Sequence, residues 1–273
     1  AMSIDLEAGL AYIPTQENPF FYAIQEDYKK TGVFKWTPGQ WNMGIEMSSL
    51  AQNILNNLES QPKPGGFLKA FDPLTGETKW SVPIPHYWNG GVLGTAGGLV
   101  FQGDALGMFS AYDKDTGERL WEFNTYTSML APPITFEIDG EQYVSILTGS
   151  GGGDLFGGEP LPPIEIQASL TYNNFGRLLV FKLGGKETLP IPNVRDKTIP
   201  EQKLVQASID QLQDGESKYN QNCAVCHGFV VKSAGGIPDL RKMTAGTHDA
   251  FNQIVLEGLL ASNGMASFSD VLS

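Results

Sequence analysis

Short apolar segments separated by Gly, Asp and Pro dominate the first two thirds of the chain, residues 1–184. Strand-length runs rich in β-branched and aromatic residues occur at positions 98–102, 134–138, 143–147 and 177–181. Runs of this length and composition are typical of β-strands. Asp139-Gly140 separates two of them, and because both residues tolerate positive φ, the pair predicts a hairpin turn. Residues 1–184 are therefore predicted to be all-β.

An eleven-residue motif occurs twice, at residues 70–80 and 111–121, with six identical positions and a spacing of 41 residues. The shared pattern is Ala-x-Asp-x-x-Thr-Gly-Glu-x-x-Trp. A period near 40 with several strands per unit is typical of β-propeller blades. We expect the aspartates to bond the backbone of the following turn, the glycines to be left-handed, and the tryptophans to contact the neighbouring blade. At about 40 residues per blade, the β portion predicts four blades or somewhat more, counting an insertion between Asn18 and Gly65.

The strand pattern stops after residue 184. Residues 185–209 contain prolines and charges without periodicity, which predicts an extended linker. Residues 210–273 then predict a small helical domain. Asp210 is the expected N-cap of a helix that runs to Asn222, and residues 250–260 predict a second helix.

Composition narrows the possible partners. The formal net charge is -12, which disfavours a nucleic-acid partner because phosphate binding needs a basic face. No apolar run reaches the roughly 18 residues of a membrane span, so no span is expected in this chain. The chain has only two cysteines, which excludes a disulfide framework. Those two cysteines are three positions apart, so we expect them to belong to one local site rather than to a disulfide that links distant segments.

Cys223, Cys226 and His227 form a C-x-x-C-H motif, the pattern of covalent c-type haem attachment. Two thiols one helical turn apart can reach both vinyl groups at one porphyrin edge, and the adjacent His is then held beneath the iron. The alternatives are a redox-active dithiol or half of a zinc site. A redox dithiol usually begins a helix after a strand, whereas this pair ends a polar helix. Zinc needs two more ligands, and the chain has three His and no other Cys.

The motif is similar to that of small c-type cytochromes, and this resemblance implies further iron contacts. Such cytochromes place a sixth ligand some forty residues after the motif. Met265, in a Gly-Met loop 38 residues after His227, matches that position, and Met243 is the second candidate. A thioether ligand raises the haem potential, which suits an electron acceptor. Pro238 resembles the proline whose carbonyl accepts a hydrogen bond from the haem-ligating His and fixes its orientation.

The repeated motif, the proline-rich linker and the haem motif together resemble the PQQ-dependent quinohaemoprotein alcohol dehydrogenases. The likeness also includes residues 2–16, 90–103, 131–135 and 179–185, and so spans essentially the whole chain. It implies an incomplete, eight-bladed PQQ-type propeller followed by a small all-α cytochrome c domain. In that family PQQ and calcium lie on the propeller axis, an aspartate takes the proton of the alcohol substrate, and electrons pass to haem c.

The resemblance places the family's calcium ligands, catalytic aspartate, PQQ-contacting arginine and adjacent-cysteine disulfide before residue 1. No residue of this chain is therefore assigned a catalytic role. Asn89, Ser150 and Gly151 correspond to the rim of the PQQ site, although tight turns that need glycine explain these loops equally well. The cytochrome domain stops soon after Met265, where the family continues into one more helix.

These features leave two functions open. The first is part of an alcohol-oxidising quinohaemoprotein, in which this chain only carries electrons to a soluble redox protein or a quinone. The second is a non-catalytic PQQ-like propeller that binds a partner and is fused to an electron-transfer cytochrome c. A periplasmic location is expected because covalent haem attachment occurs outside the bacterial cytoplasm. About half a propeller ring also predicts an open blade face that is prone to aggregation.

Several histidines and tryptophans have no assigned chemistry. His86 and His248 are expected at the surface or in turns. Trp36, Trp41 and Trp88 either line a substrate funnel or, more commonly for such residues, pack between blades or in a small core of the insertion.

Overall fold

The computed structural model describes residues 1–273 except for positions 20–21, 38–41, 49–52, 54–55, 58, 61, 151–164, 203–204 and 234–236. The described residues divide into two compact units. One comprises residues 1–19, 62–150 and 165–196, and the other comprises residues 22–60 and 197–273. The second unit thus combines the helical end of the chain with a segment that lies in sequence between two strands of the first.

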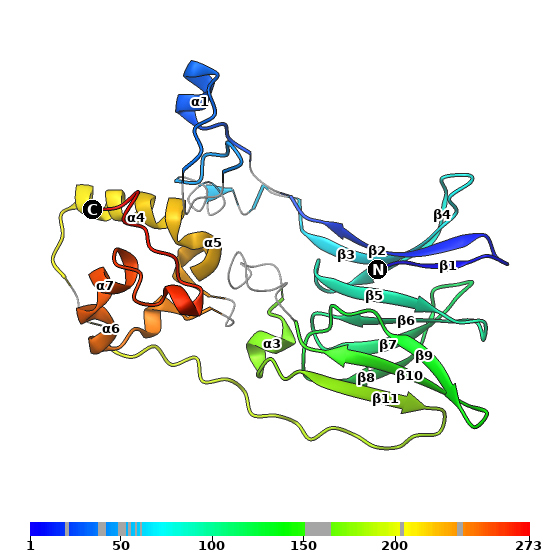
Figure 1. Ribbon diagram of the computed structural model, residues 1–273. Coiled ribbons are helices and arrows are strands. Elements are labelled where there is room, and N and C mark those ends of the chain that lie inside the picture. The colour runs from blue at the N-terminus through cyan, green and yellow to red at the C-terminus, as the bar shows by residue number, and fades with distance from the viewer. Residues whose placement is uncertain are drawn as a thin grey trace. The chain divides into compact units, whose positions relative to one another are not determined.

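In the described residues, the first unit forms three antiparallel sheets (Figure 1). The first sheet has the order β1-β2-β3-β4, with strands Ser3–Asp5, Leu10–Glu17, Gly65–Phe71 and Thr78–Ile84. The second has the order β5-β6-β7-β8, with strands Asn89–Gly94, Leu99–Asp104, Met108–Asp113 and Arg119–Asn124. The third has the order β11-β10-β9, in which β9 is Ile134–Ile138, β10 is Glu141–Thr148 and β11 is Arg177–Lys182. A short helix, α3 (Ala168–Thr171), precedes β11.

The predicted strands are confirmed, since the four apolar runs overlap β6, β9, β10 and β11. Asp139 and Gly140 form the predicted two-residue turn between β9 and β10, with φ of 53° and 78°. The count of four blades is wrong for the described residues, which form three sheets. The predicted count took all of residues 1–184 as blades of about 40 residues each. The described residues from 22 to 60, however, contribute no strand to these sheets.

Both copies of the repeated motif form the predicted turn, one between β3 and β4 and the other between β7 and β8. The Asp72 carboxylate accepts hydrogen bonds from two backbone N–H groups of its turn at 2.9 and 3.2 Å, and Asp113 does the same at 3.0 and 2.9 Å. These bonds hold the pKa of both carboxyls below the usual value. Gly76 and Gly117 have φ of 78° and 74°, the left-handed conformation that glycine adopts without strain.

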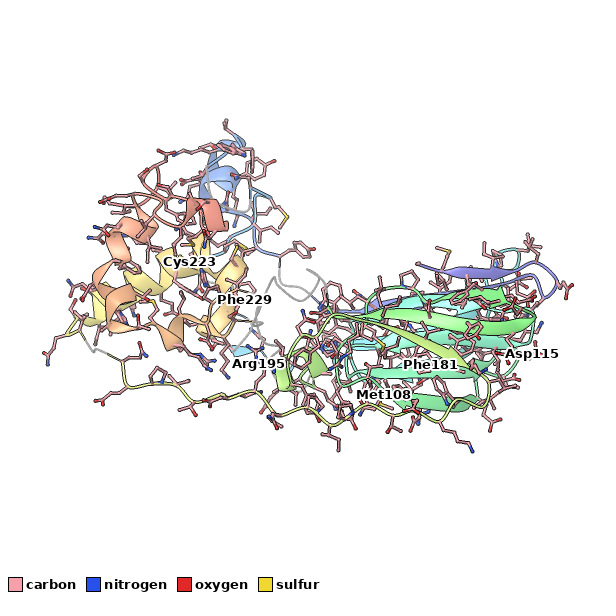
Figure 2. The ribbon with its side chains drawn as sticks, turned by 60° about the horizontal axis from the view of Figure 1, so that its bottom comes forward. Met108, Asp115, Phe181, Arg195, Cys223 and Phe229 are labelled. Carbon is pink, nitrogen blue, oxygen red and sulfur yellow. The ribbon has the colours of Figure 1, made fainter. Side chains whose placement is uncertain are left out.

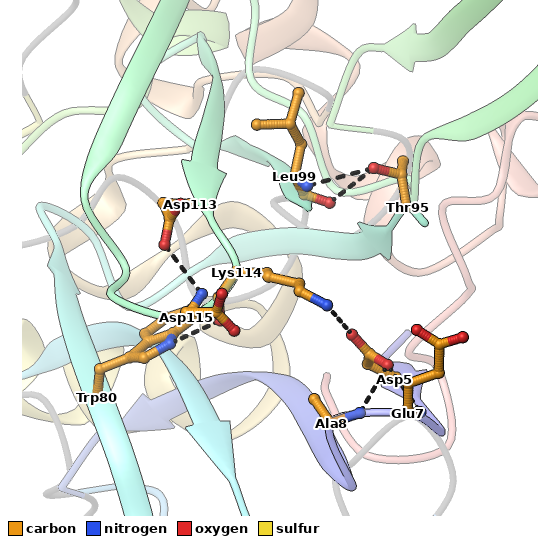
Figure 3. Close-up of polar contacts among 9 residues, drawn as sticks. All are labelled: Asp5, Glu7, Ala8, Trp80, Thr95, Leu99, Asp113, Lys114 and Asp115. Carbon is orange, nitrogen blue, oxygen red and sulfur yellow. Dashed lines mark hydrogen bonds and ion pairs between the residues drawn. The ribbon is translucent and has the colours of Figure 1, made fainter. Parts of the chain in front are cut away.

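Trp80 joins the first sheet to the second (Figure 3). Its indole Nε1 donates to the backbone carbonyl of Lys114, in the turn between β7 and β8, at 3.0 Å. The ring covers Gly117 so closely that a Cβ there would lie 2.8 Å from two ring carbons. The Lys114 ammonium also pairs with the Asp5 carboxylate of β1 at 3.0 Å. The expected packing of the motif tryptophan against the neighbouring blade is therefore confirmed for Trp80.

Apolar side chains fill both seams between the sheets, and their burial is the main stabilising contribution. Between the first and second sheets the buried cluster consists of Leu10, Tyr12, Leu68, Ala70, Trp80, Ile84, Val92, Val100 and Tyr112. Between the second and third it consists of Phe109, Met129, Val144 and Ile146, with Leu93, Phe101, Leu179 and Phe181 against them. Trp121 of β8 contacts the rings of Phe109 and Phe181, at centroid distances of 5.8 and 5.4 Å.

The opposite face of the third sheet is apolar and exposed. Residues directly opposite each other on antiparallel strands share a face, and the register places five aliphatic side chains together. These five side chains, each more than half exposed, are those of Ile134, Ile138, Leu147, Leu178 and Val180. Glu141, Ser145 and Lys182 share this face. An open blade face is what the sequence predicts, and exposed aliphatic side chains grouped on one face favour association.

The second unit is helical. Near the end of the chain it contains α4 (Ile209–Asn222), α5 (Ala224–His227), α6 (Ala245–Asp249) and α7 (Phe251–Val255), with 3-10 turns η1 (Phe229–Val231), η2 (Leu240–Lys242) and η3 (Ala261–Asn263). Its earlier segment contains α1 (Glu26–Thr31). Every helix in the described part of the chain is too short or too polar to cross a lipid bilayer.

Two helix predictions are corrected. The N-cap of α4 is Ser208 rather than Asp210, because Ser208 and Gln211 form a reciprocal capping box with bonds of 3.2 and 2.9 Å. The predicted helix at residues 250–260 ends early, at Val255. The carbonyls of Val255 and of the next residue accept hydrogen bonds from residues 268 and 267, so they do not support a further helical turn.

Candidate haem site

The three residues of the C-x-x-C-H motif lie on one turn of helix. Cys223 occupies the junction at which the polar helix α4 ends and α5 begins. Its carbonyl accepts hydrogen bonds from the N–H of Cys226 at 3.1 Å and of His227 at 2.9 Å. Positions three apart on a helix share one side, so the two thiols, which are half-buried and unbridged, share one side of the turn.

His227 is buried, and its Nδ1 lies 2.9 Å from the carbonyl oxygen of Pro238. A carbonyl only accepts hydrogen bonds, so Nδ1 carries the proton and Nε2 keeps a lone pair that can bind a metal. A bond of this kind orients a metal-ligating imidazole and raises its basicity. The predicted hydrogen bond between His227 and Pro238 is therefore present, and this geometry fits an iron ligand.

The thiol environment bears on the alternative of a redox-active dithiol. Burial raises the pKa of Cys223 to about 11 and also raises the pKa of Cys226. A redox dithiol works through a thiolate, whose pKa is lowered by positive neighbours or by a helix N-terminus. The raised pKa of both thiols disfavours that alternative.

Met265 and Met243 are both half-buried, so each has part of its side chain within the second unit. Met265 follows η3 and Gly264, whose φ is 93°, and its N–H donates to the carbonyl of Leu260 at 3.2 Å. The N–H of Phe268 donates to the carbonyl of Val255 at 2.8 Å, which fixes the far end of the Met265 loop to α7. Met243 directly follows η2. The assignment of Met265 as sixth ligand stays a prediction.

Replacing Met265 by alanine is expected to lower the haem midpoint potential, because the thioether ligand that favours the reduced iron is lost. Axial ligands tune haem potentials over about 0.8 V, so we expect a fall of about 0.1 V or more in a redox titration. Met243→Ala is the matched control and should leave the potential unchanged. A fall in Met243→Ala and none in Met265→Ala would assign the ligand to Met243.

Comparison with known proteins identifies both parts of the chain. Residues 82–144 match the family model "Glucose/ethanol/alcohol dehydrogenase, beta-propeller domain", and residues 210–273 match "Cytochrome C oxidase, cbb3-type, subunit III". The quinohemoprotein alcohol dehydrogenase ADH IIB of Pseudomonas putida is 40% identical over 279 residues, which covers 100% of this chain and 37% of that protein. The chain is related throughout its length to the quinohaemoprotein alcohol dehydrogenases.

Solved structures give the same result. The quinohemoprotein alcohol dehydrogenase ADHIIG of Pseudomonas putida HK5 aligns with a TM-score of 0.79 at 31% identity. The quinohemoprotein alcohol dehydrogenase of Comamonas testosteroni aligns with a TM-score of 0.71 at 32% identity. Both alignments cover 100% of this chain and 38% of the solved chain. This chain therefore spans somewhat more than a third of the length of its quinohaemoprotein relatives, and it pairs PQQ-type propeller sheets with a cytochrome c domain.

Two of the residues that the quinohaemoprotein resemblance assigns to the PQQ rim, Asn89 and Ser150, make internal hydrogen bonds. The Asn89 amide, at the start of β5, donates to the carbonyl of Thr15 in the first sheet at 3.1 Å. Ser150 is buried, and its N–H donates to the side-chain oxygen of Asn174 at 2.9 Å. Gly151 lies outside the described residues. A PQQ contact at these three positions stays a prediction.

His86 lies in the turn between β4 and β5, as one of the two expectations had it, but it is not at the surface, since it is 1% exposed. Its Nδ1 accepts a hydrogen bond from the N–H of Trp88 at 2.9 Å, and burial lowers its pKa to about 4. Its carbonyl lies against Gly66 of β3, where a Cβ would overlap it. His248 is partly buried, and its Nε2 lies 3.0 Å from the side-chain oxygen of Gln202.

Asp104, at the end of β6, is a buried carboxyl that sequence reasoning missed. It pairs in register with Asn89, and its Oδ1 accepts from the N–H of Met108 at 2.8 Å. Burial raises its pKa to about 6, despite backbone N–H donors that favour the ionised form. A turn between β6 and β7 begins at Asp104, and the N–H of Gly107 donates to the Asp104 carbonyl. The sequence signal for this turn is an Asp three residues before a Gly.

The tryptophans without assigned chemistry have different environments. Trp36 is 65% exposed, so the expectation that it belongs to a small core of the insertion is wrong. Trp88 is half-buried and contacts Tyr87 at a centroid distance of 5.7 Å. Trp41 lies outside the described residues.

Proposed function

We propose that this chain is the electron-accepting part of a PQQ-dependent quinohaemoprotein that oxidises alcohols. Haem c would be attached through Cys223 and Cys226, with His227 and Met265 as axial ligands. The observation that carries the proposal is the hydrogen bond from His227 Nδ1 to the Pro238 carbonyl. His227 lies on the same helical turn as both thiols. That hydrogen bond leaves Nε2 of the imidazole available to a metal, next to two unbridged thiols three residues apart on one helical turn.

Each residue has a distinct role in this proposal. PQQ with calcium supplies the two-electron oxidation of the alcohol, and haem c supplies a one-electron acceptor. The thiols of Cys223 and Cys226 would hold the macrocycle in place, and the Pro238 carbonyl would keep the His227 imidazole in one tautomer and one orientation. The Met265 thioether would raise the haem potential and so favour electron transfer to the haem.

The alcohol substrate comes from the names of the relatives and from the family resemblance, which also places the catalytic aspartate and calcium ligands in blades that this chain does not contain. The chain by itself would therefore carry electrons without oxidising an alcohol. Its electrons would pass to a soluble redox protein or to a quinone. A periplasmic location follows from the attachment chemistry, because bacterial cytochrome c maturation takes place outside the cytoplasm.

The chain matured with the haem-attachment machinery gives a direct test. Dithionite should reduce its haem, whereas PQQ, calcium and ethanol together should leave the haem oxidised. The measurement is the absorbance of the reduced haem bands after each addition. Reduction that depends on ethanol would show that this chain holds its own catalytic residues and would contradict the proposed division of labour.

A further inference from the structure

The insertion between β2 and β3 has a local fold of its own. Ile24 and Ile45 form an antiparallel bridge, and two backbone hydrogen bonds flank it. The N–H of Gln25 donates to the carbonyl of Gly44 at 3.0 Å, and the N–H of Glu46 donates to that of Ala23 at 2.8 Å. These bonds give residues 45–48, which we call the brace, a fixed conformation at the end of this small fold.

The brace contacts the cytochrome part of the second unit. Ile45 and Met47 form a buried apolar pair, 7% and 5% exposed, and Phe229 of η1 packs against this pair. The side-chain amide of Asn220, itself 3% exposed, donates to the carbonyl of Ser48 at 3.2 Å. One apolar contact and one polar contact thus connect segments more than 170 positions apart in the sequence.

Both contacts fall beside the haem-attachment segment, residues 223–228. Asn220 lies three residues before Cys223, and Phe229 lies two residues after His227. Cys223 and Phe229 flank the short helix α5 (Figure 2). The brace therefore contacts the chain on both sides of the two thiols and the imidazole, while it contacts none of the three ligating residues directly in the hydrogen bonds and apolar clusters of the described residues.

The segment that follows the motif needs such support. Val230 and Val231 have φ of 55° and 63°, a left-handed conformation that β-branched residues rarely adopt. Strained backbone of this kind persists only where the surrounding contacts over-determine it. Tyr219 provides one such contact, since its hydroxyl donates to the carbonyl of Gly228 at 2.6 Å. The packing of Phe229 against the brace provides another.

We propose that the brace, residues 45–48, positions the haem-attachment segment by holding Asn220 and Phe229, and so sets the orientation of the His227 imidazole relative to the two thiols. This inference rests on the proposed function, in which that imidazole binds the haem iron. Ile45, Met47 and Ser48 act through other residues, and are positioning residues. The haem environment is then built in part by a segment that the chain contributes from between two propeller strands.

The test replaces Met47 by alanine in the full chain, with Met47→Leu as the conservative variant. Met43→Ala is the matched control, because Met43 belongs to the same insertion and is 55% exposed. Two readouts are used: the midpoint potential of the haem-loaded chain, and hydrogen exchange of the His227 and Gly228 amides in the haem-free chain. Met47→Ala should shift the potential and speed the exchange of both amides by about tenfold or more. Met47→Leu should keep the midpoint potential and the exchange rates close to those of the wild-type chain, and Met43→Ala should change neither.

A loss of thermal stability in Met47→Ala without a change in either readout would overturn the proposal, since the brace would then be core packing only. If Met47→Ala does not fold, Asn220→Ala removes the hydrogen bond to the Ser48 carbonyl, together with the packing of the buried amide, and gives the same two readouts. Failure of the wild-type chain to bind haem covalently would contradict the proposed function instead. In that case the exchange measurement on the haem-free chain still decides whether the brace orders the segment.

Discussion

Alanine at both Cys223 and Cys226 is expected to abolish covalently bound haem when the chain is produced with the cytochrome c maturation machinery. Each thiol forms one thioether bond to the porphyrin edge, and the chain contains no other cysteine to replace them. After acid-acetone extraction, a pyridine haemochrome spectrum of the wild-type chain should show the c-type signal. The spectrum of the double variant should show none.

The single variant Cys223→Ala should also lose the two-thioether spectrum, since one bond remains at most. Val225→Ala is the matched control, because position 225 lies between the two thiols and is one of the variable positions of the motif. It should keep the full signal. Covalent haem in the double variant would place the attachment elsewhere and would remove the basis of the electron-transfer proposal.

His86 and Asp104 are expected to give opposite pH dependences of folding stability within the first unit. The His86 pKa falls from 6.5 to about 4 on folding, so its contribution is complete above pH 6.5 and is lost as the pH falls toward 4. The Asp104 pKa rises from 3.8 to about 6, so its ionisation destabilises the fold as the pH rises through that window. Each shift corresponds to about 3 kcal/mol, and in the wild-type chain the two largely cancel.

Single variants should expose each contribution in urea unfolding curves measured between pH 4 and 6.5. Asp104→Asn should leave the His86 dependence, so its free energy of unfolding should fall by about 3 kcal/mol relative to wild type as the pH is lowered. His86→Asn, which keeps an acceptor for the Trp88 N–H, should show the opposite trend with a similar magnitude. The double variant should parallel wild type. Parallel curves for wild type and both single variants would show that neither group is buried as described.

The sheets and the haem motif could be predicted from the sequence because they depend on residues close together in the chain. The turns at Asp72 and Asp113 are formed by hydrogen bonds within four residues, so each copy of the motif carries its own structure. The C-x-x-C-H motif likewise fits on one helical turn. Even the bond from His227 to Pro238 spans only eleven positions.

The errors arose where distant segments decide the local outcome. His86 lies in a turn with polar and aromatic neighbours, yet it is 1% exposed, and its carbonyl lies against Gly66 of β3, twenty residues earlier in the chain. The helix after residue 250 has helical sequence character, yet residues 267 and 268 take the carbonyls that its next turn would need. The insertion also has no sequence feature that assigns it to the cytochrome unit. That assignment depends on Ile45 and Met47 meeting Phe229.

Ser208 and Asp210 illustrate a smaller ambiguity. Both residue types cap helices well, and they lie two positions apart. Gln211 decides between them, because it lies three residues after Ser208 and returns a hydrogen bond to its N–H. A search for the reciprocal pair, rather than for a single capping residue, would have found the correct start.

Both seams between the sheets contain directional hydrogen bonds that set the alignment of the sheets. The Trp80 indole reaches one particular carbonyl, so a small rotation of the first sheet against the second breaks a directional bond. Trp121 meets the third sheet through ring contacts, and hydrogen bonds reinforce that seam. The N–H of Ala168 donates to the carbonyl of Ala105 at 2.9 Å, and the hydroxyls of Ser128 and Ser169 lie 2.8 Å apart. Sliding at either seam would break directional bonds, so under heat or mechanical load the three sheets should lose their alignment together.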